Sequence, residues 1–254
     1  MSWTAVVLAG SRPGRDTFAE QFGTALKPLI PVGGEPMVRR PVRALLQSGG
    51  VGKILVVSQS PDRIAAVLPE DARIEFRKSA GSIAETIERI VLDRSTAFPL
   101  IVTTADHALL DAQMIAEFTA AAQGADLAIG VVERRPLLAR LPQTQRTWLA
   151  FRGGAYSGAN LFALGSIKTL AAIEQWRAVE QDRKKGWRVL SALGPALLLG
   201  ALLRVRTLDQ SVAATGRKLG LTARAIVLSD PLAAVDVDKP DDHALVEAIL
   251  AGRA

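Results

Sequence analysis

Short runs of β-branched and aliphatic residues alternate along this chain with segments whose apolar residues recur every three or four positions. The runs predicted as strands lie at residues 4–9, 53–58, 73–76, 100–104 and 127–132. The segments predicted as amphipathic helices lie at residues 37–47, 62–68, 82–92 and 111–122. Because strands that alternate with helices form mostly parallel sheets covered on both faces, we predict an α/β fold with three layers.

The last third of the chain contains further elements in a less regular order. Strands are predicted at residues 147–152, 159–164 and 223–228, and helices at residues 166–182, 207–219 and 241–250. Residues 189–205 are strongly apolar and are interrupted at Gly194 and Pro195, which predicts two short helices. We expect one domain over residues 1–254, with a small helical subdomain at about residues 166–220.

Composition excludes several classes of protein and site. The chain has 254 residues, of which 49% are hydrophobic, enough to bury the core of one domain. It has no cysteine, which excludes disulfides, thiolate nucleophiles and cysteine-ligated zinc. The net charge of +6 favours anionic ligands, but the basic residues are dispersed and there is one tyrosine. We therefore expect no nucleic-acid partner.

Two apolar segments bear on the location of the protein. The N-terminal sequence MSWTAVVLAG has no basic start, and its apolar run is too short for a signal peptide, so a cytoplasmic protein is expected. Residues 183–205 have an apolar core that is too short and too interrupted to span a bilayer, which requires about 20 apolar residues. A buried subdomain is the favoured interpretation of this segment. A homodimer contact and peripheral membrane contact through Trp187 are the alternatives.

Ligands of a parallel sheet bind beyond the carboxyl ends of its strands, and the first such position here is a glycine-rich loop. The sequence AGSRPGR follows the first predicted strand, and its backbone N–H groups can face a phosphate. Arg12 and Arg15 can each bind two phosphate oxygens, and Lys27 adds a compact positive charge. Spacing alone nevertheless favours a surface loop with solvated arginines.

Acidic residues occur at two further positions that suit metal binding or catalysis. Asp106 directly follows an uncharged predicted strand, where a carboxylate fits either a divalent metal ion or the cap of a turn. Asp236 and Asp238 share one side of an extended segment and repel each other unless a cation or solvent intervenes. Asp241 and Asp242 fit the first turn of the last helix.

The turn in RKSAGSIAETI links a predicted strand to a predicted helix. Its small polar residues, Ser79, Gly81 and Ser82, can contact a base or a ribose. An ordinary helix cap is the favoured local interpretation, because serine is a preferred residue at helix N-termini.

Five short sequences occur in an order that resembles one family. LAGSRPGR at residues 8–15 is followed by KPL at 27–29, GGEPM at 33–37, TAD at 104–106 and DVDKPDD at 236–242. This set resembles nucleotidyltransferases of the sugar-nucleotide and molybdenum-cofactor guanylyltransferase type, whose GT-A-like domain begins with an LAGGxGxRM-like loop followed by KPLxxxxGxPM. The resemblance spans residues 8–242 and implies a GT-A/Rossmann-like fold with a mostly parallel central sheet.

The resemblance also implies a reaction. It implies that a nucleotidyl group passes from an NTP, with CTP or GTP favoured, to a phosphorylated small molecule, with release of pyrophosphate and with Mg²⁺ as cofactor. It assigns Lys27 to the α-phosphate and Asp106 and Asp238 to the metal ion. The predicted catalytic residues are Lys27 and Arg15, and the predicted nucleotide-binding residues are Leu8, Ala9, Gly10, Ser11, Arg12, Gly14, Ser79, Gly81 and Ser82.

The sequence departs from the family pattern in two places. Ser11 occupies a position where glycine is usual, and His107 follows Asp106 where many relatives have proline. A structural role is favoured for His107, because no acid or base is paired with it in the motif. The alternatives to a nucleotidyltransferase are a GT-A glycosyltransferase, with DVD as its DxD site, and a non-catalytic nucleotide-binding module. The late position of DVD and the presence of Lys27 argue against both.

Overall fold

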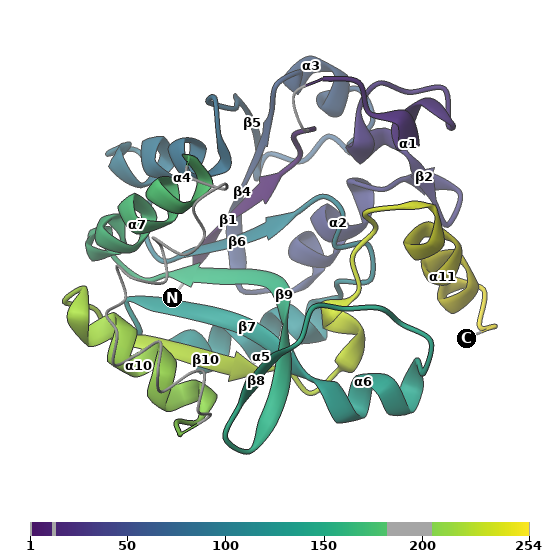
Figure 1. Ribbon diagram of the computed structural model, residues 1–254. Helices are drawn as coiled ribbons and strands as arrows, with labels where there is room; N and C mark the ends of the chain where they lie inside the picture. The colour runs from purple at the N-terminus through teal and green to yellow at the C-terminus, as the bar shows by residue number, and fades with distance from the viewer. Residues whose placement is uncertain (1, 12–13, 182–204, 254) are drawn as a thin grey trace.

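The computed structural model describes residues 2–11, 14–181 and 205–253, and it is built around a mostly parallel sheet (Figure 1). In this part of the chain the sheet has eight strands, in the order β10-β7-β9-β6-β1-β4-β5, with β8 paired to β9. The strands are β1 (Trp3–Leu8), β4 (Val51–Ser58), β5 (Ile74–Lys78), β6 (Leu100–Thr104), β7 (Leu127–Glu133), β8 (Leu149–Phe151), β9 (Gly154–Leu164) and β10 (Ala223–Val227). β9 runs antiparallel to β6, β7 and β8, whereas the other neighbours run parallel.

Helices cover both faces of the sheet, which gives the predicted three layers (Figure 1). Side chains alternate along β1, so that Ala5 and Val7 enter one hydrophobic cluster and Val6 enters the other. The first cluster packs under α2 (Arg39–Gln47) and α5 (Ala112–Ala122), and the second under α4 (Ile83–Leu92) and α7 (Leu170–Gln181). The predicted α/β fold with a mostly parallel central sheet is confirmed.

Short elements complete the described structure. They are α1 (Thr17–Glu20), α3 (Pro61–Ala65), α6 (Arg134–Arg140), α10 (Leu208–Lys218), α11 (Pro240–Leu250), the hairpin strands β2 (Pro31–Val32) and β3 (Glu35–Pro36), and the 3₁₀ turns η1 (Lys27–Leu29), η2 (Ile167–Thr169) and η4 (Pro231–Ala234). As predicted, α11 begins at a proline and has acidic residues in its first turn.

The prediction from sequence was incomplete for two neighbouring elements. The helix α6 was not predicted, because RRPLLAR has a proline inside it and only Leu137 buried, too little for a recognisable apolar period. The strand β9 is longer than the predicted 159–164, since Gly154, Ser157 and Gly158 interrupt the β-branched pattern of its first half. Pairing with β7 and β8 makes that half a strand despite its composition.

The apolar segment of the last third falls mostly outside the described residues. The two short helices predicted at 189–205, with Gly194 and Pro195 between them, lie in residues 182–204 apart from Val205. On either side of that gap, α7 packs against α4, and α10 packs against β10. No helix in the described part of the chain is both long enough and apolar enough to cross a membrane.

Candidate active site

The carboxyl ends of three central strands converge on the side of the molecule where α1 and α11 lie (Figure 1). Backbone hydrogen bonds join these ends: Ala9 N donates to Val57 O at 2.8 Å, and Ala105 N donates to Leu8 O at 3.0 Å. The late segment is joined in the same way, because Val237 N donates to Asp106 O at 3.0 Å. The loops after β1 and β6 and the segment before α11 therefore meet at one edge of the sheet, as the topology predicts.

The glycine-rich loop is fixed to the end of β4 by a glutamine. Gln59 accepts a hydrogen bond from Ser11 N at 3.1 Å through Oε1 and donates one to Ser11 O at 2.8 Å through Nε2. A Cβ on Gly10 would lie 3.0 Å from the Gln59 amide, so glycine allows this close approach. Ser11 Oγ also accepts a hydrogen bond from Lys27 N at 3.0 Å. Ser11, where glycine is usual, thus links the loop to Lys27.

Lys27 lies between the two aspartates predicted to bind a metal ion. Its Nζ is 2.7 Å from Asp106 Oδ2 and 2.5 Å from Asp238 Oδ1. The side chains of Lys27 and Asp106 are 16% and 20% exposed, whereas Asp238 is half exposed at 53%. Thr104 Oγ1 donates to the second oxygen of Asp106 at 2.5 Å, which fixes that carboxylate. The structure therefore brings together residues that are far apart in the sequence.

The electrostatics of this centre keep Lys27 charged. Burial lowers the pKa of the Lys27 ammonium, but the charges and hydrogen bonds of Asp106 and Asp238 outweigh burial and raise the pKa above its ordinary value. The two carboxylates surround one position and accept a cation there. In the part of the chain that the structure describes, no three acidic or histidine side chains gather as a metal site. Two carboxylates suit Mg²⁺, which completes its coordination with substrate phosphates and water.

Asp236, the first aspartate of DVD, points into a different network. Its carboxylate is 2.5 Å from Arg146 Nη1 and accepts a hydrogen bond from Asn160 Nδ2 at 2.9 Å. Arg146 and Asp236 are 13% and 15% exposed, so the pair is largely buried. Asn160 adopts a positive φ of 48° where the β7–β9 register shifts. Asp236 and Asp238 thus have separate partners, with the buried Val237 between them, and Asp236 anchors the segment that presents Asp238.

The other residues of the opening loop that were predicted as site residues differ in their positions and roles. Arg15 Nε pairs with Glu20 Oε1 at 2.6 Å, and its side chain is 80% exposed, so the structure does not bring Arg15 to the Lys27 centre. Gly14 adopts a positive φ of 104°, which favours glycine. Ala9 is buried and Leu8 packs into a core cluster, so both position the loop. Arg12 lies outside the described residues.

The Ser79–Ser82 turn and the first residues of α4 form hydrogen bonds with each other and with Glu180 of α7. Ser82 Oγ accepts from Glu85 N at 3.2 Å and caps α4, which was the favoured local interpretation. The Glu180 carboxylate accepts from Ile83 N at 3.3 Å and Ala84 N at 3.2 Å. Ser79 Oγ is buried without a hydrogen-bond partner. The turn lies beyond the carboxyl end of β5.

His107 is part of the core beneath the centre. It is 1% exposed, and its Nδ1 lies 3.3 Å from Thr103 Oγ1. Burial lowers its pKa to about 4, against weaker opposing contributions led by the nearby Asp236 charge, so the imidazole is neutral at pH 7. The structural role predicted for His107 fits this position.

Sequence reasoning missed three residues that shape the site. Gln59 directly follows β4, so the rule that ligand sites form at the ends of parallel strands could have found it. Arg146 and Asn160 gave no local signal, because their roles depend on Asp236, which lies far along the chain.

Solved structures share the fold over nearly the whole chain. A hypothetical transferase from Thermus thermophilus superposes with a TM-score of 0.81 at 30% sequence identity, over 96% of this chain and 100% of that one. A 4-diphosphocytidyl-2C-methyl-D-erythritol synthase from Anaerococcus prevotii gives 0.62 at 11% identity, over 98% and 96%. A CMP:2-keto-3-deoxy-manno-octonic acid synthetase in complex with CTP gives 0.60 at 13% identity, over 100% of both chains. At these identities, the last two show the fold alone.

Sequence comparison identifies the family. A search of curated proteins gave no significant match. The family model of the MobA-like NTP transferase domain, in contrast, matches residues 5–198, which include the glycine-rich loop, Lys27 and Asp106. The chain therefore belongs to the MobA-like NTP transferases, and it is an enzyme of the nucleotidyltransferase class.

Proposed function

We propose that this enzyme transfers a nucleotidyl group from CTP or GTP to a phosphorylated small molecule, in the cytoplasm, with Mg²⁺ as cofactor. The observation that supports this most is the convergence of Lys27, Asp106 and Asp238 at the carboxyl edge of the sheet. In the reaction an oxygen of the acceptor phosphate attacks the α-phosphorus of the NTP. The bond from the α-phosphorus to the bridging oxygen breaks, and pyrophosphate leaves.

The residues of the site suit the negative charge that accumulates in this reaction. Backbone N–H groups of the loop from Gly10 to Arg15 bind the triphosphate, and Lys27 binds the α-phosphate as charge develops. Arg15 reaches the β- or γ-phosphate after it leaves Glu20, with which it forms an exposed ion pair. A divalent ion held by Asp106 and Asp238 would neutralise phosphate charge at the same place.

Two features guide the choice of nucleotide. The names of two solved structures refer to cytidine nucleotides, which makes CTP the first nucleotide to test. The Ser79–Ser82 turn is our candidate for the contacts with the base, because it follows the carboxyl end of β5. A thermal-shift panel of NTPs with Mg²⁺ identifies the nucleotide, and a pyrophosphate-release screen of sugar and alcohol phosphates then identifies the acceptor.

Substitution of the two aspartates tests the metal site. Asp106→Asn and Asp238→Asn keep the side-chain shape but remove a charge, so each should lower pyrophosphate release by more than about 100-fold without unfolding the protein. Asp209→Asn, an exposed residue in the first turn of α10, is the matched control and should retain full activity. Activity equal to the control would contradict the assignment. Release of a nucleoside diphosphate from a nucleotide sugar, with no pyrophosphate released from any NTP, would indicate a glycosyltransferase.

A further inference from the structure

Three aromatic rings join α1 to α11. Phe18 lies in α1, Phe22 lies shortly after it, and His243 lies near the start of α11. The centroid of the His243 ring is 6.3 Å from that of Phe18 and 4.8 Å from that of Phe22, and the two phenylalanine rings are 5.6 Å apart, edge to face. Aromatic rings attract each other at such separations. The cluster therefore holds α1 against α11, which lie on the same side of the molecule in Figure 1.

His243 is also bound to the hairpin of β2 and β3. Its Nε2 donates to Pro31 O in β2 at 2.7 Å, and one turn further along α11, Glu247 Oε1 accepts a hydrogen bond from Gly33 N at 2.7 Å. The His243 side chain is 16% exposed, so neighbouring elements enclose most of it. A single side chain thus contacts both the hairpin and the segment of α1.

The first of the joined elements, α1, directly follows the glycine-rich loop. The loop from Gly10 to Arg15 is proposed to bind the triphosphate, and Asp16 separates it from the helix. Asp16 Oδ1 accepts hydrogen bonds from Phe18 N at 3.1 Å and Ala19 N at 3.0 Å, which fixes the end of the loop to α1. A shift of α1 would therefore move the end of the loop.

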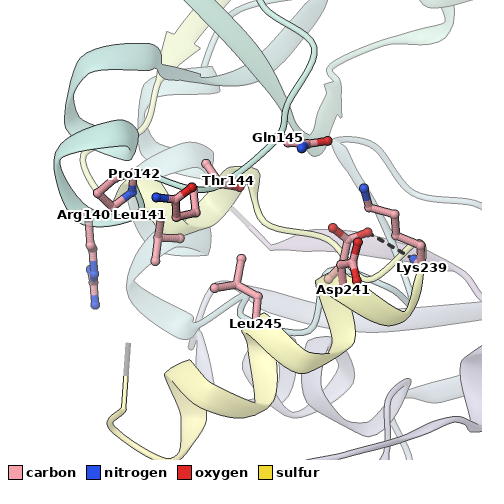
Figure 2. A pocket seen from close by; sticks show the side chains of 10 residues that line it. Arg140, Leu141, Pro142, Thr144, Gln145, Lys239, Asp241 and Leu245 are labelled. Carbon is pink, nitrogen blue, oxygen red and sulfur yellow. Dashed lines mark hydrogen bonds between the residues drawn. The ribbon is translucent and has the colours of Figure 1, made fainter.

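The other joined element, α11, begins two residues after Asp238, the proposed metal ligand. Asp242 Oδ2 accepts hydrogen bonds from Asp238 N and Lys239 N, each at 3.1 Å. Figure 2 shows this turn of α11 beside a cleft that it lines, with the hydrogen bond from Lys239 drawn as a dashed line. Asp242 directly precedes His243, so the turn that fixes Asp238 is also the turn that is joined to α1.

We propose that His243 is a positioning residue, which holds the glycine-rich loop and Asp238 in the arrangement that lets a nucleoside triphosphate and a divalent ion bind together. This inference rests on the proposed function. Mg²⁺ requires oxygen ligands at about 2.1 Å, so a carboxylate and a phosphate on separate segments can share it only if the segments are fixed relative to each other. Fixing them in the free protein lowers the ordering cost of binding. His243 acts through α1 and α11, without contacting either ligand.

The affinity for CTP, with and without the ion, tests this role. In His243→Leu the Kd for CTP in Mg²⁺ should rise about 10-fold, within the usual range of coupling between two sites, while the Kd in EDTA should change less than about 2-fold. Isothermal titration calorimetry without an acceptor measures both constants, and GTP is titrated in the same way.

Val246→Ala is the matched control for a loss of stability alone. Val246 is fully buried in the same helix, and its truncation leaves a cavity but removes no aromatic ring. The thermal midpoint of this variant should fall, while both dissociation constants stay within about 2-fold of the wild-type values.

His243→Gln separates the ring from the hydrogen bond and is less disruptive than leucine. Glutamine keeps an N–H group for Pro31 O but has no ring to contact Phe22, and it should reproduce most of the rise of Kd in Mg²⁺. Phe22 is 37% exposed, so Phe22→Ala should fold, and it should also raise this Kd. Because both changes break the same contact, the double variant should bind about as well as the weaker single variant.

Three results would overturn the role of His243. They are an equal rise of the Kd in Mg²⁺ and in EDTA, no rise of the Kd in Mg²⁺, and additive effects of His243→Gln and Phe22→Ala. A histidine that only stabilises the fold gives the first or the second of these, together with a lower thermal midpoint. If the wild-type protein bound CTP and GTP no more tightly in Mg²⁺ than in EDTA, the metal site of the proposed function would fail, and the coupling with it. The wild-type titration thus separates a failure of the proposed function from a failure at His243.

Discussion

The Lys27 ammonium lies between two carboxylates that repel each other, and under the proposed function this position gives the residue two roles. In the free protein it neutralises Asp106 and Asp238, from which it is separated by 2.7 Å and 2.5 Å. Its stem of four carbons also allows the charge to follow a phosphate, which the rigid fork of an arginine would do less easily. A lysine at this position can therefore serve both the resting site and the nucleotidyl group that is transferred.

The two roles predict different kinetics for Lys27 and Arg15. Lys27→Ala should lower kcat by about 100-fold or more, because it removes a charge that meets charge developing in the transition state. Arg15→Ala should mainly raise the KM for NTP, because an exposed arginine that binds a terminal phosphate contributes equally to the ground and transition states. Steady-state kinetics with varied NTP separate the two. Increases in KM alone for both variants would contradict the distinction.

His107 predicts how stability depends on pH. Its folded-state pKa of about 4 lies below the value near 6.5 of an unfolded chain, so between these values the unfolded state binds a proton that the folded state does not. Stability therefore falls as pH drops through this window, by about 2 kcal/mol between pH 7 and pH 5. Urea unfolding should show this loss in the wild type and not in His107→Met.

Two carboxylates with lowered pKa values titrate below this window. Asp93 and Asp126 have pKa values lowered to about 2, mainly by backbone hydrogen bonds from Ser95 and Thr222, so their contribution to stability is lost only below about pH 4. An equal loss of stability in wild type and His107→Met between pH 7 and pH 5 would show that a group other than His107 is responsible.

At the level of elements, the bulged strand β9 holds the DVD segment against the sheet. Asn160 on β9 and Arg146 before β8 both bind Asp236, and Val237 N donates to Asp106 O. Val237 itself is fully buried. These contacts leave Asp238 at the surface of the centre, so an antiparallel strand inserted between β6 and β7 positions a residue that we propose as a metal ligand.

Removal of Arg146 should affect both stability and activity. Arg146→Met leaves Asp236 largely buried and unpaired, which should lower the free energy of unfolding by about 3 kcal/mol and reduce kcat as Asp238 loses its position. Arg89→Met, which breaks an exposed pair with Glu85 within α4, should change stability by less than about 0.5 kcal/mol. Urea unfolding of both variants provides the comparison.

A double variant gives the Arg146 prediction its control. Adding Asp236→Asn to Arg146→Met removes the unpaired charge and keeps a partner for Asn160, so much of the lost stability should return. A loss in Arg146→Met no greater than that in Arg89→Met would show that the buried pair contributes little.

The elements that the sequence predicted well are those in which local pattern and burial agree. β1 and β6 are uncharged apolar runs in the centre of the sheet, and α5 has a capping aspartate before it and apolar residues at helical spacing. The first half of β9 and the role of Asp236 could not be predicted, because both depend on partners distant in sequence. The site residues Lys27, Asp106 and Asp238 were predicted from family resemblance, since local sequence left Asp106 equally explained by a turn.

At the scale of the whole molecule, the centre joins the first and last segments of the chain. Lys27 and Asp238 are 211 positions apart in sequence. The same two segments meet again where His243 Nε2 donates to Pro31 O at 2.7 Å and Gly33 N donates to Glu247 Oε1 at 2.7 Å. A ligand that binds both segments should therefore stabilise the domain as a unit.

Hydrogen exchange can show whether nucleotide and metal ion engage both segments. NTP with EDTA should slow amide exchange mainly in the loop at residues 9–16, because the triphosphate binds its N–H groups. NTP with Mg²⁺ should in addition slow exchange at residues 236–242, because the ion draws Asp238 to the phosphates. In Asp238→Asn the second effect should disappear while the first remains. If Mg²⁺–NTP protected residues 9–16 alone in the wild type, Asp238 would not be a metal ligand, and the ion would depend on Asp106 without a second carboxylate from the end of the chain.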